Sequence, residues 1–391
     1  MTLSRRGPAN GSPRATLVLT TIFDPVILED YFENFKRFRH LDHVEVIVIP
    51  DRKTPAEAYQ RCHGLKQRGL DVLYPTLEEQ QAFLKRLDLP PNFIPENSDN
   101  RRNVGYLMAL ESHSDFVISL DDDNFCFPDT DVIAEHAVVC HGQQETQVVS
   151  TETGWFNLCH LLELDRVEAV YPRGYPYYAR HRAEHPARSS QMVDVHLNAG
   201  LWLESPDLDG MTWLVAPTMA KAFKGSSVVL GPKTWTPINT QNTALHRDAI
   251  AAYYFVRMGP ELAGLPIDRY GDIFSGYFVQ ACTRHLGGAI RAGTPVAAHR
   301  RNRHDYFRDA ASELGCILVL EDLLPWLTEV RLEGATYVEA YTSLSDALDE
   351  AVEAFQGKVW TEMTRGYFHE MADCMRQWIR AYQLLTSAIN V

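Results

Sequence analysis

The sequence predicts an α/β fold in which a mostly parallel sheet carries helices on both faces, followed by a helical region at the C-terminal end. Two observations predict it. Over the first 120 residues, short apolar and β-branched runs alternate with segments of helical length, a pattern typical of parallel sheets. From about residue 343 onward, apolar residues recur with helical spacing instead.

Composition fits a globular protein and narrows its function. Of 391 residues, 45% are hydrophobic, enough for a large core, and no segment reaches the ~20 apolar residues of a membrane span. The net charge of −14 argues against a nucleic-acid binder. Seven scattered cysteines without a C-x-x-C pair favour a reducing, cytoplasmic setting.

Four strands and their connecting helices are expected before residue 121. Residues 1–14 are polar and are expected to form a disordered leader. A core domain then begins with β-branched runs. The expected strands are 15–21, 44–49, 69–74 and 116–120, and the expected helices are 26–38, one starting near residue 54, 77–87 and 100–112.

From residue 125 to 330 the pattern is less regular, with many Gly, Pro and aromatic residues. This texture suits an acceptor-binding half built on the same sheet, so that residues 15–330 form one catalytic domain. The expected elements there are strands 147–151, 198–203 and 227–230 and a helix over 273–285. Residues 331–391 form a helical region with segments 343–355 and 361–385, and Ser345 with Asp346 is the expected N-cap.

Three adjacent aspartates, Asp121, Asp122 and Asp123, follow the apolar strand 116–120. Ligands of parallel sheets bind beyond the carboxyl ends of the strands, and Asp51 also lies at such an end. Carboxylates in an Asp-x-Asp pattern suit Mg²⁺ or Mn²⁺. The alternative is a solvated turn in which one aspartate caps the next segment.

Two further stretches carry charged residues in suggestive positions. Arg173 and Arg180 are seven residues apart around a Gly-Tyr-Pro turn, and their guanidinium groups suit a diphosphate or a sugar. Asp207 and Asp209 lie in an acidic turn after a Gly-Leu-Trp-Leu strand. The alternatives are arginines that stack on the aromatic residues of their loop and an ordinary surface turn.

The last two candidates precede a helix and follow a strand. Asp272 lies just before the apolar segment 273–285, where an acid also stabilises a helix N-terminus without any other role. His299 lies in a basic segment near residue 300. Neutral imidazole binds Mn²⁺, so His299 is a candidate cation ligand. The alternative is that His299 is an ordinary polar residue of the surface.

Taken together and in order, these segments resemble the reversibly glycosylated polypeptides, the UDP-arabinopyranose mutase family, over about residues 16–330. The segments that carry the resemblance are Asn100–Tyr106, the aspartates 121–123, Arg173–Pro176 with Arg180, Gly200–Leu203 with Asp207 and Asp209, and Arg269–Asp272 with the distant His299.

The resemblance implies a GT-A glycosyltransferase-like fold, a UDP-sugar and a divalent cation, Mn²⁺ or Mg²⁺. It implies that Asp123 holds the cation, with Asp121 toward the cation or the ribose and His299 as a late ligand. Asp122 is expected near the sugar or an arginine. The nucleotide-binding residues are expected to include four more: Thr20, Asp51, Arg102 and Trp202.

In that family one arginine of the Arg-Gly-Tyr-Pro loop becomes glycosylated, and this role is carried over to Arg173, supported by Arg180. Asp207, Asp209 and Asp272 are the candidates for acid–base chemistry. The sequence departs from the family at Gly271, where the family's Arg-Tyr-Asp-Asp segment has a carboxylate.

The expected function is a metal-dependent pyranose–furanose mutase that acts on a nucleotide sugar such as UDP-arabinose. One alternative is a glycosyltransferase that passes the sugar to a small-molecule acceptor in a bacterial specialised pathway. A second is a non-catalytic scaffold of the same fold. Self-association through the C-terminal helices is also expected.

Overall fold

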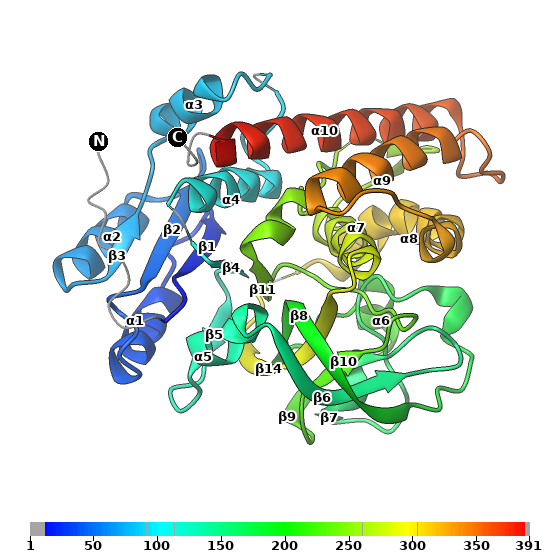
Figure 1. The fold of residues 1–391 in the computed structure, drawn as a ribbon, viewed down its shortest axis with the longest axis horizontal. Coiled ribbons are helices and arrows are strands. Elements are labelled where there is room, and N and C mark those ends of the chain that lie inside the picture. Colours follow the sequence, from blue (N-terminus) through cyan, green and yellow to red (C-terminus); the bar gives the residue numbers. More distant parts are fainter. Residues whose placement is uncertain (1–11, 91, 113, 260, 303, 388–391) are drawn as a thin grey trace.

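A 12-stranded sheet runs through the protein (Figure 1). Ten of its strands follow the order β3-β2-β1-β4-β11-β8-β6-β10-β14-β5, and β9 pairs with β8 and with β7 outside this order. The computed structural model describes residues 12–387 except 91, 113, 260 and 303. Residues 1–11 of the expected leader therefore lie outside the described residues, and residues 12–14 have no regular structure. The predicted α/β class with a helix-flanked sheet is confirmed.

The N-terminal part of the sheet is parallel, because β1 pairs in parallel with β2 and β4, and β2 with β3. Alternate residues of β1 enter different cores: Leu17 packs with the apolar faces of α1 and α2, and Val18 with α4. The bounds are β1 Ala15–Thr21, α1 Ile27–Arg37, β2 Val44–Pro50, α2 Ala56–Gln67, β3 Asp71–Leu73, α3 Leu77–Arg86, α4 Arg102–Glu111 and β4 Phe116–Leu120. All four predicted strands of this part are confirmed.

The rest of the sheet is mixed. β11 (Asn242–His246) lies antiparallel between β4 and β8 (Ala187–Glu204), and β14 (Ala289–His299) runs parallel to β8. The register between β14 and β8 shifts between Gly293 and Ala297, after which His299 lies beside Glu204 of β8 and Asn124 of β5 (Asn124–Cys126). The sheet thereby brings His299 next to the aspartates that precede Asn124.

Shorter elements complete this half. The strands are β6 Gln143–Ser150, β7 Leu162–Leu164, β9 Ala220–Phe223, β10 Val228–Leu230, β12 Glu261–Leu262 and β13 Leu265–Pro266. The α-helices are α5 Val132–His136 and α6 Gly210–Val215. The 3₁₀ turns are η2 Asp99–Arg101, η3 Ala137–Cys140, η4 Leu158–Leu161, η5 Tyr177–Ala179 and η6 Arg247–Ala252.

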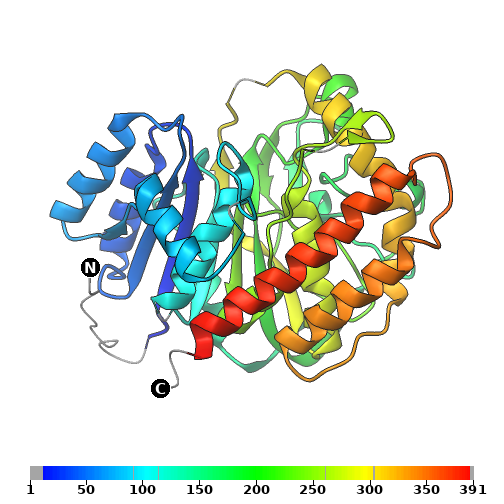
Figure 2. The same cartoon turned by 90° about the horizontal axis from the view of Figure 1, so that it is seen from above.

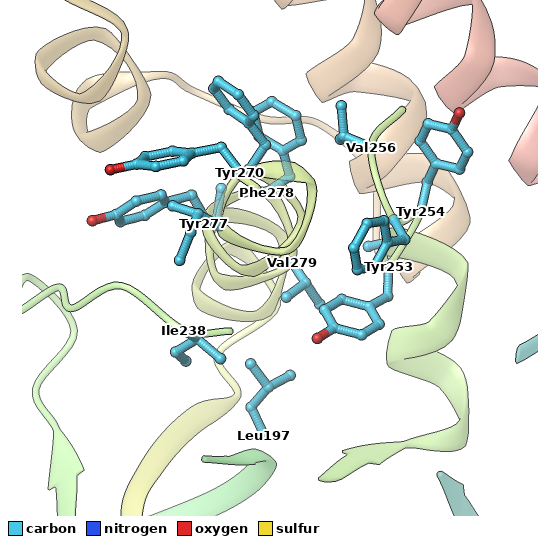
Figure 3. Close-up of a cluster of buried hydrophobic side chains, with 14 of the residues drawn as sticks. Leu197, Ile238, Tyr253, Tyr254, Val256, Tyr270, Tyr277, Phe278 and Val279 are labelled. Carbon is cyan, nitrogen blue, oxygen red and sulfur yellow. The ribbon is translucent and has the colours of Figure 1, made fainter. Parts of the chain in front are cut away.

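The helix α7 (Gly271–His285) lies inside the protein. Every residue from Gly271 to Thr283 is buried, which is typical of a helix surrounded by other elements. Figure 3 shows its side chains pointing outward in several directions, with Tyr253 and Val256 on one side and Ile238 on another. The N-terminal end of α7, which carries Asp272, is therefore enclosed by protein.

Three long helices follow, α8 (Tyr306–Glu329), α9 (Tyr337–Ala351) and α10 (Glu362–Ser387). The predicted C-terminal helix is confirmed by α10, whereas α8 was not predicted. The predicted N-cap at Ser345 and Asp346 is wrong. The helix α9 begins at Tyr337, because the Thr336 hydroxyl accepts from the Glu339 amide and the Glu339 carboxylate accepts from the Thr336 amide, a capping box.

The helices α9 and α10 lie side by side against the core, next to α7 and α4 respectively (Figures 1 and 2). The buried Trp378 of α10 donates its indole N–H to the carbonyl of Ile250 at 2.9 Å. Their apolar faces are used within this chain, and self-association through them stays a prediction. No helix in the described part of the chain combines the length and apolar character that a membrane crossing needs.

Candidate active site

Arg102, the first residue of α4, ties together the carboxyl ends of two neighbouring strands. Its guanidinium donates to the Thr20 hydroxyl at 3.1 Å, the Leu120 carbonyl at 3.1 Å and the Asp121 carboxylate at 2.5 Å. Burial alone would lower the pKa of Arg102, but the Asp121 carboxylate outweighs it and raises the pKa. Three residues predicted at the nucleotide, Thr20, Arg102 and Asp121, therefore lie together.

The aspartate triplet, Asp121, Asp122 and Asp123, splits in three directions. Asp121 faces Arg102, Asp122 accepts from the Thr21 hydroxyl at 2.5 Å, and Asp123 lies 3.4 Å from the imidazole Nε2 of His299. Burial and its two acidic neighbours raise the pKa of Asp122 to about 6, while burial of Asp123 is outweighed by His299, so its pKa is lowered. The three carboxylates therefore have different environments and different partners.

Asp123 and His299 fit two ligand positions around a divalent cation. The Nδ1 of His299 lies 2.6 Å from the carbonyl oxygen of Ser205, which makes Nδ1 the donor and turns Nε2 toward Asp123. Adjacent ligands of an octahedral cation are roughly 3 Å apart, close to the observed 3.4 Å. Among the described residues, no three His, Cys, Asp or Glu side chains gather to hold a cation, so further ligands would have to come from elsewhere.

Two residues predicted to bind the nucleotide, Asp51 and Trp202, differ in their hydrogen bonding. The Asp51 carboxylate accepts from the backbone amides of Arg52 at 2.7 Å and Ser98 at 3.2 Å, which ties two loops together. Trp202 of β8 is 3% exposed, and its indole N–H has no partner within the described residues. Their nucleotide-binding roles stay predictions.

Arg173 lies in a clamp of two carboxylates, those of Asp207 and Asp272. Its Nε and Nη2 donate to Asp207 at 3.0 and 3.1 Å, and its Nη1 and Nη2 donate to Asp272 at 3.0 and 2.7 Å. The fifth N–H donates to the carbonyl of Arg269. All five donors of a guanidinium are therefore used, and the side chains of this Arg173 clamp are at most 9% exposed.

Electrostatics keeps the Arg173 clamp charged. Burial alone would raise the pKa of Asp207, but Arg173 outweighs it and lowers the pKa to about 2. Burial alone would lower the pKa of Arg173, and Asp207 and Asp272 raise it well above its ordinary value. Removing either partner would leave an uncompensated charge in the interior.

Backbone geometry places the Arg173 clamp. Gly174 has φ +88°, a left-handed conformation that glycine adopts without strain. A Cβ at this position would lie 2.5 Å from the Ile273 side chain, so the turn brings Arg173 close to the start of α7. Arg269 also has a positive φ, +65°, and its carbonyl accepts from Arg173.

The second predicted arginine, Arg180, has its own partner. It donates to the Asp209 carboxylate at 2.6 Å and stacks 3.6 Å above the ring of Tyr177. Asp209 is fully buried, caps α6 through the Thr212 amide at 2.7 Å and accepts from the Tyr177 hydroxyl at 3.1 Å. The predicted residues thus form two separate ion pairs, with Arg173 on Asp207 and Arg180 on Asp209.

Two consecutive residues, Asn239 and Thr240, link the Arg173 clamp to the aspartate triplet. The Asn239 amide donates to Asp207 at 2.7 Å, and the Thr240 carbonyl accepts from Arg102 at 3.0 Å. Arg102 in turn binds Asp121. The charge of Asp272 also raises the pKa of Asp121, after the larger effect of burial. The two groups therefore form one continuous site.

Sequence reasoning missed three residues that support this site. Asn239 and Thr21 have no motif of their own, although Thr21 follows the predicted Thr20 at the end of β1. Glu313 of α8 accepts from Arg269 at 2.9 Å and from the Gly210 amide at 2.7 Å. No clear signal pointed to Glu313, because Gly315 and Pro325 interrupt the helical pattern of α8.

Gly271, where the family's motif has a carboxylate, has no room for any side chain. A Cβ there would lie 2.3 Å from the Val256 carbonyl and 2.6 Å from the Phe255 ring. The packing around the start of α7 therefore excludes a carboxylate side chain at this position.

The α/β sheet carries the Arg102–Asp121 pair at the carboxyl ends of β1 and β4. The family model for "Reversibly glycosylated polypeptide" matches residues 17–387, and the chain belongs to this family. The family resemblance inferred from the sequence is confirmed.

Curated relatives are plant proteins. The chain is 29% identical over 288 residues to UDP-arabinopyranose mutase 1 of Arabidopsis thaliana, which covers 73% of this chain and 72% of that protein. It is 30% identical to probable UDP-arabinopyranose mutase 1 of Zea mays over 73% and 71% of the two chains. Among solved structures, glucosyl-3-phosphoglycerate synthase of Mycobacterium tuberculosis with Mn²⁺ and UDP-glucose matches at TM-score 0.40 and 11% identity, over 81% and 84% of the two chains.

Proposed function

We propose that the protein is a divalent-cation-dependent pyranose–furanose mutase that acts on a UDP-sugar of the UDP-arabinose type. The observation that carries the proposal is the continuous site: the aspartate triplet, Arg102 and the Arg173 clamp come from distant segments and meet through Asn239 and Thr240. The relatives named UDP-arabinopyranose mutase support the substrate class.

Asp123 and His299 are proposed to hold Mn²⁺ or Mg²⁺. When bound, such a cation neutralises the charge that develops on a departing diphosphate. The protein's own part is to turn Nε2 of His299 toward Asp123 by holding its Nδ1 on the Ser205 carbonyl. Arg102 pairs with Asp121 and offsets part of the effect that burial and Asp123 have on the pKa of Asp121.

The sugar is proposed to react beside the Arg173 clamp. Ring contraction requires cleavage of the bond between C1 and the UDP oxygen, attack by the sugar's O4 on C1 with loss of the O4 proton, and cleavage of the C1–O5 ring bond with delivery of a proton to O5. The UDP oxygen then bonds to C1 again. Asp272 and Asp207 are the carboxylates nearest to Arg173. Glycosylation of Arg173 itself, as the family resemblance implies, would break at least one of its five hydrogen bonds, so the clamp has to open for that step.

The free cysteines support the proposed cytoplasmic location, because all seven are thiols in the structure, as is usual in reducing compartments.

The test is to incubate the protein with UDP-arabinopyranose and Mn²⁺ and separate the nucleotide sugars. We expect UDP-arabinofuranose to form and its formation to stop when the cation is chelated. Intact-mass spectrometry of the same sample should show a sugar adduct that Arg173→Ala removes. Absence of any ring-contracted product with Mn²⁺ present would contradict the mutase.

A glycosyltransferase with a small-molecule acceptor is the second candidate, and Gly271 favours it. The family's motif has a carboxylate at this position, and here no side chain fits. A transferase needs the nucleotide and cation residues but not a group that serves ring contraction. UDP and free sugar as the only products of the same incubation would support it.

A further inference from the structure

Arg301, two residues beyond His299, is a buried cation that the proposed function does not use. It lies in the segment between β14 and α8, and its side chain is 7% exposed. The guanidinium carbon lies 5.1 Å from the ring centre of Trp213 and 5.7 Å from that of Tyr306. These two rings stack at 5.4 Å with an interplanar angle of 7°. Cation–π contact with this stack holds the guanidinium in place.

Two hydrogen-bond donors in this place have no partner. The Nη1 of Arg301 and the Nε1 of Trp213 are buried, and neither has an acceptor among the described residues. The Asp309 carboxylate is 4.0 Å from Nη2 of Arg301 and is engaged by His304 at 2.8 Å. Buried donors are almost always satisfied, because leaving them unpaired costs free energy. Two such donors, one on Arg301 and one on the Trp213 ring that it contacts, predict a ligand rich in acceptor oxygens.

The segment that carries Arg301 adjoins the aspartate triplet. The segment is tied to the aspartate triplet, because the Arg300 amide donates to the Asp123 carbonyl at 3.0 Å. A ligand at Arg301 would therefore lie next to the proposed cation position.

We propose that Arg301 and Trp213 form an anion site for the diphosphate of the nucleotide sugar, with the guanidinium and the indole N–H donating to phosphoryl oxygens. The planar guanidinium matches the geometry of phosphate oxygens. The assignment rests on the proposed function for the identity of the ligand, and on the two unpartnered donors for its chemistry.

Titration calorimetry with UDP and Mn²⁺, with uridine and with metal-free pyrophosphate tests the proposal. In Arg301→Gln we expect UDP and pyrophosphate to bind at least tenfold more weakly and uridine to bind as in the wild type. Trp213→Phe keeps an aromatic ring at this position but removes the N–H, and a loss of several-fold is expected for UDP and for pyrophosphate, with uridine unchanged. Arg300→Gln is the matched control, because the Arg300 side chain is 57% exposed, and it should leave all three affinities unchanged.

Unchanged UDP and pyrophosphate affinities in Arg301→Gln would overturn the anion site. An equal loss of affinity for uridine and UDP would also overturn it, because that result indicates a damaged fold and not a lost phosphate contact. In that case Arg301→Lys, which keeps the charge, would show the same loss. If the wild type binds no UDP at all, the proposed function fails. Arg301-dependent binding of pyrophosphate in that case would still support the anion site.

Discussion

The aspartate triplet and the Arg173 clamp both contain acidic residues, but the charged groups of the two are paired to different degrees. In the clamp, all five donors of Arg173 are used, and Asp207 is 3% exposed. In the triplet, Asp121 and Asp123 are 28% and 17% exposed, and each has a single charged partner. A saturated, buried group contributes to the architecture, whereas a partly open carboxylate pair is available for a ligand. Loss of the clamp should therefore lower stability in addition to stopping the proposed reaction, whereas loss of the triplet should affect binding with little change in stability.

The strongest test of this comparison is to break the Arg173 clamp. Arg173→Met removes the cation and leaves two buried carboxylates without their partner. We expect the free energy of unfolding to fall by about 3–5 kcal/mol, measured by urea denaturation at pH 7. A loss below about 1 kcal/mol would mean that the clamp is not architectural.

Asp123→Ala should have the opposite profile. Loss of a cation ligand should weaken Mn²⁺-dependent UDP binding about 100-fold, or about 2.7 kcal/mol, while the melting temperature stays within a few degrees of the wild type. Calorimetry with and without Mn²⁺ measures the first effect and thermal unfolding the second. Wild-type UDP affinity with Mn²⁺ would exclude Asp123 as a ligand.

The stability that Asp207 contributes should depend on acid pH. Its folded pKa, about 2, is lower than its ordinary value of 3.8, so its contribution is present above about pH 4 and is lost as the pH falls toward 2. Between pH 5 and pH 3 the difference in unfolding free energy between the wild type and Asp207→Asn should shrink by about 1 kcal/mol. A difference in unfolding free energy that is constant over this range would show that the pKa of Asp207 is not lowered in the folded state.

Tyr177→Phe is the mildest test. It removes the hydroxyl that donates to Asp209 and keeps the ring beneath Arg180. The expected cost is about 0.5–1 kcal/mol of stability, with no change in UDP affinity. A clear loss of UDP affinity would place Arg180 and Asp209 in ligand binding rather than in the architecture.

The sequence predicted the parallel part of the fold well, because buried β-branched runs such as those of β1 and β2 have few other uses. Two long elements escaped. The N-terminal half of β8 is polar and exposed from Ala187 to Met192, so it lacks the apolar pattern of a strand. The helix α8 contains Gly315 and Pro325, which are typical helix breakers and hid its spacing.

The chemistry-bearing residues could be named from the sequence, but their partners could not. Arg173 and Asp207 are 34 residues apart, and Asp272 is 99 residues from Arg173. Their contact depends on the buried position of α7 and on the turn at Gly174. No local pattern distinguishes an arginine clamped by carboxylates from one that binds phosphate. Arg301 escaped for the same reason, because its missing partner is visible only in three dimensions.

The register shift in β14 ties the position of His299 to the length of that strand. Insertions in the surface loops alter only the surface. A single residue deleted between Gly293 and His299 would turn the side chains of the strand end to the opposite face, so that the imidazole would leave Asp123 and the Arg301 segment would shift with it. The site therefore depends more on the length of this one strand than on its individual apolar residues, which tolerate exchange for others of similar size.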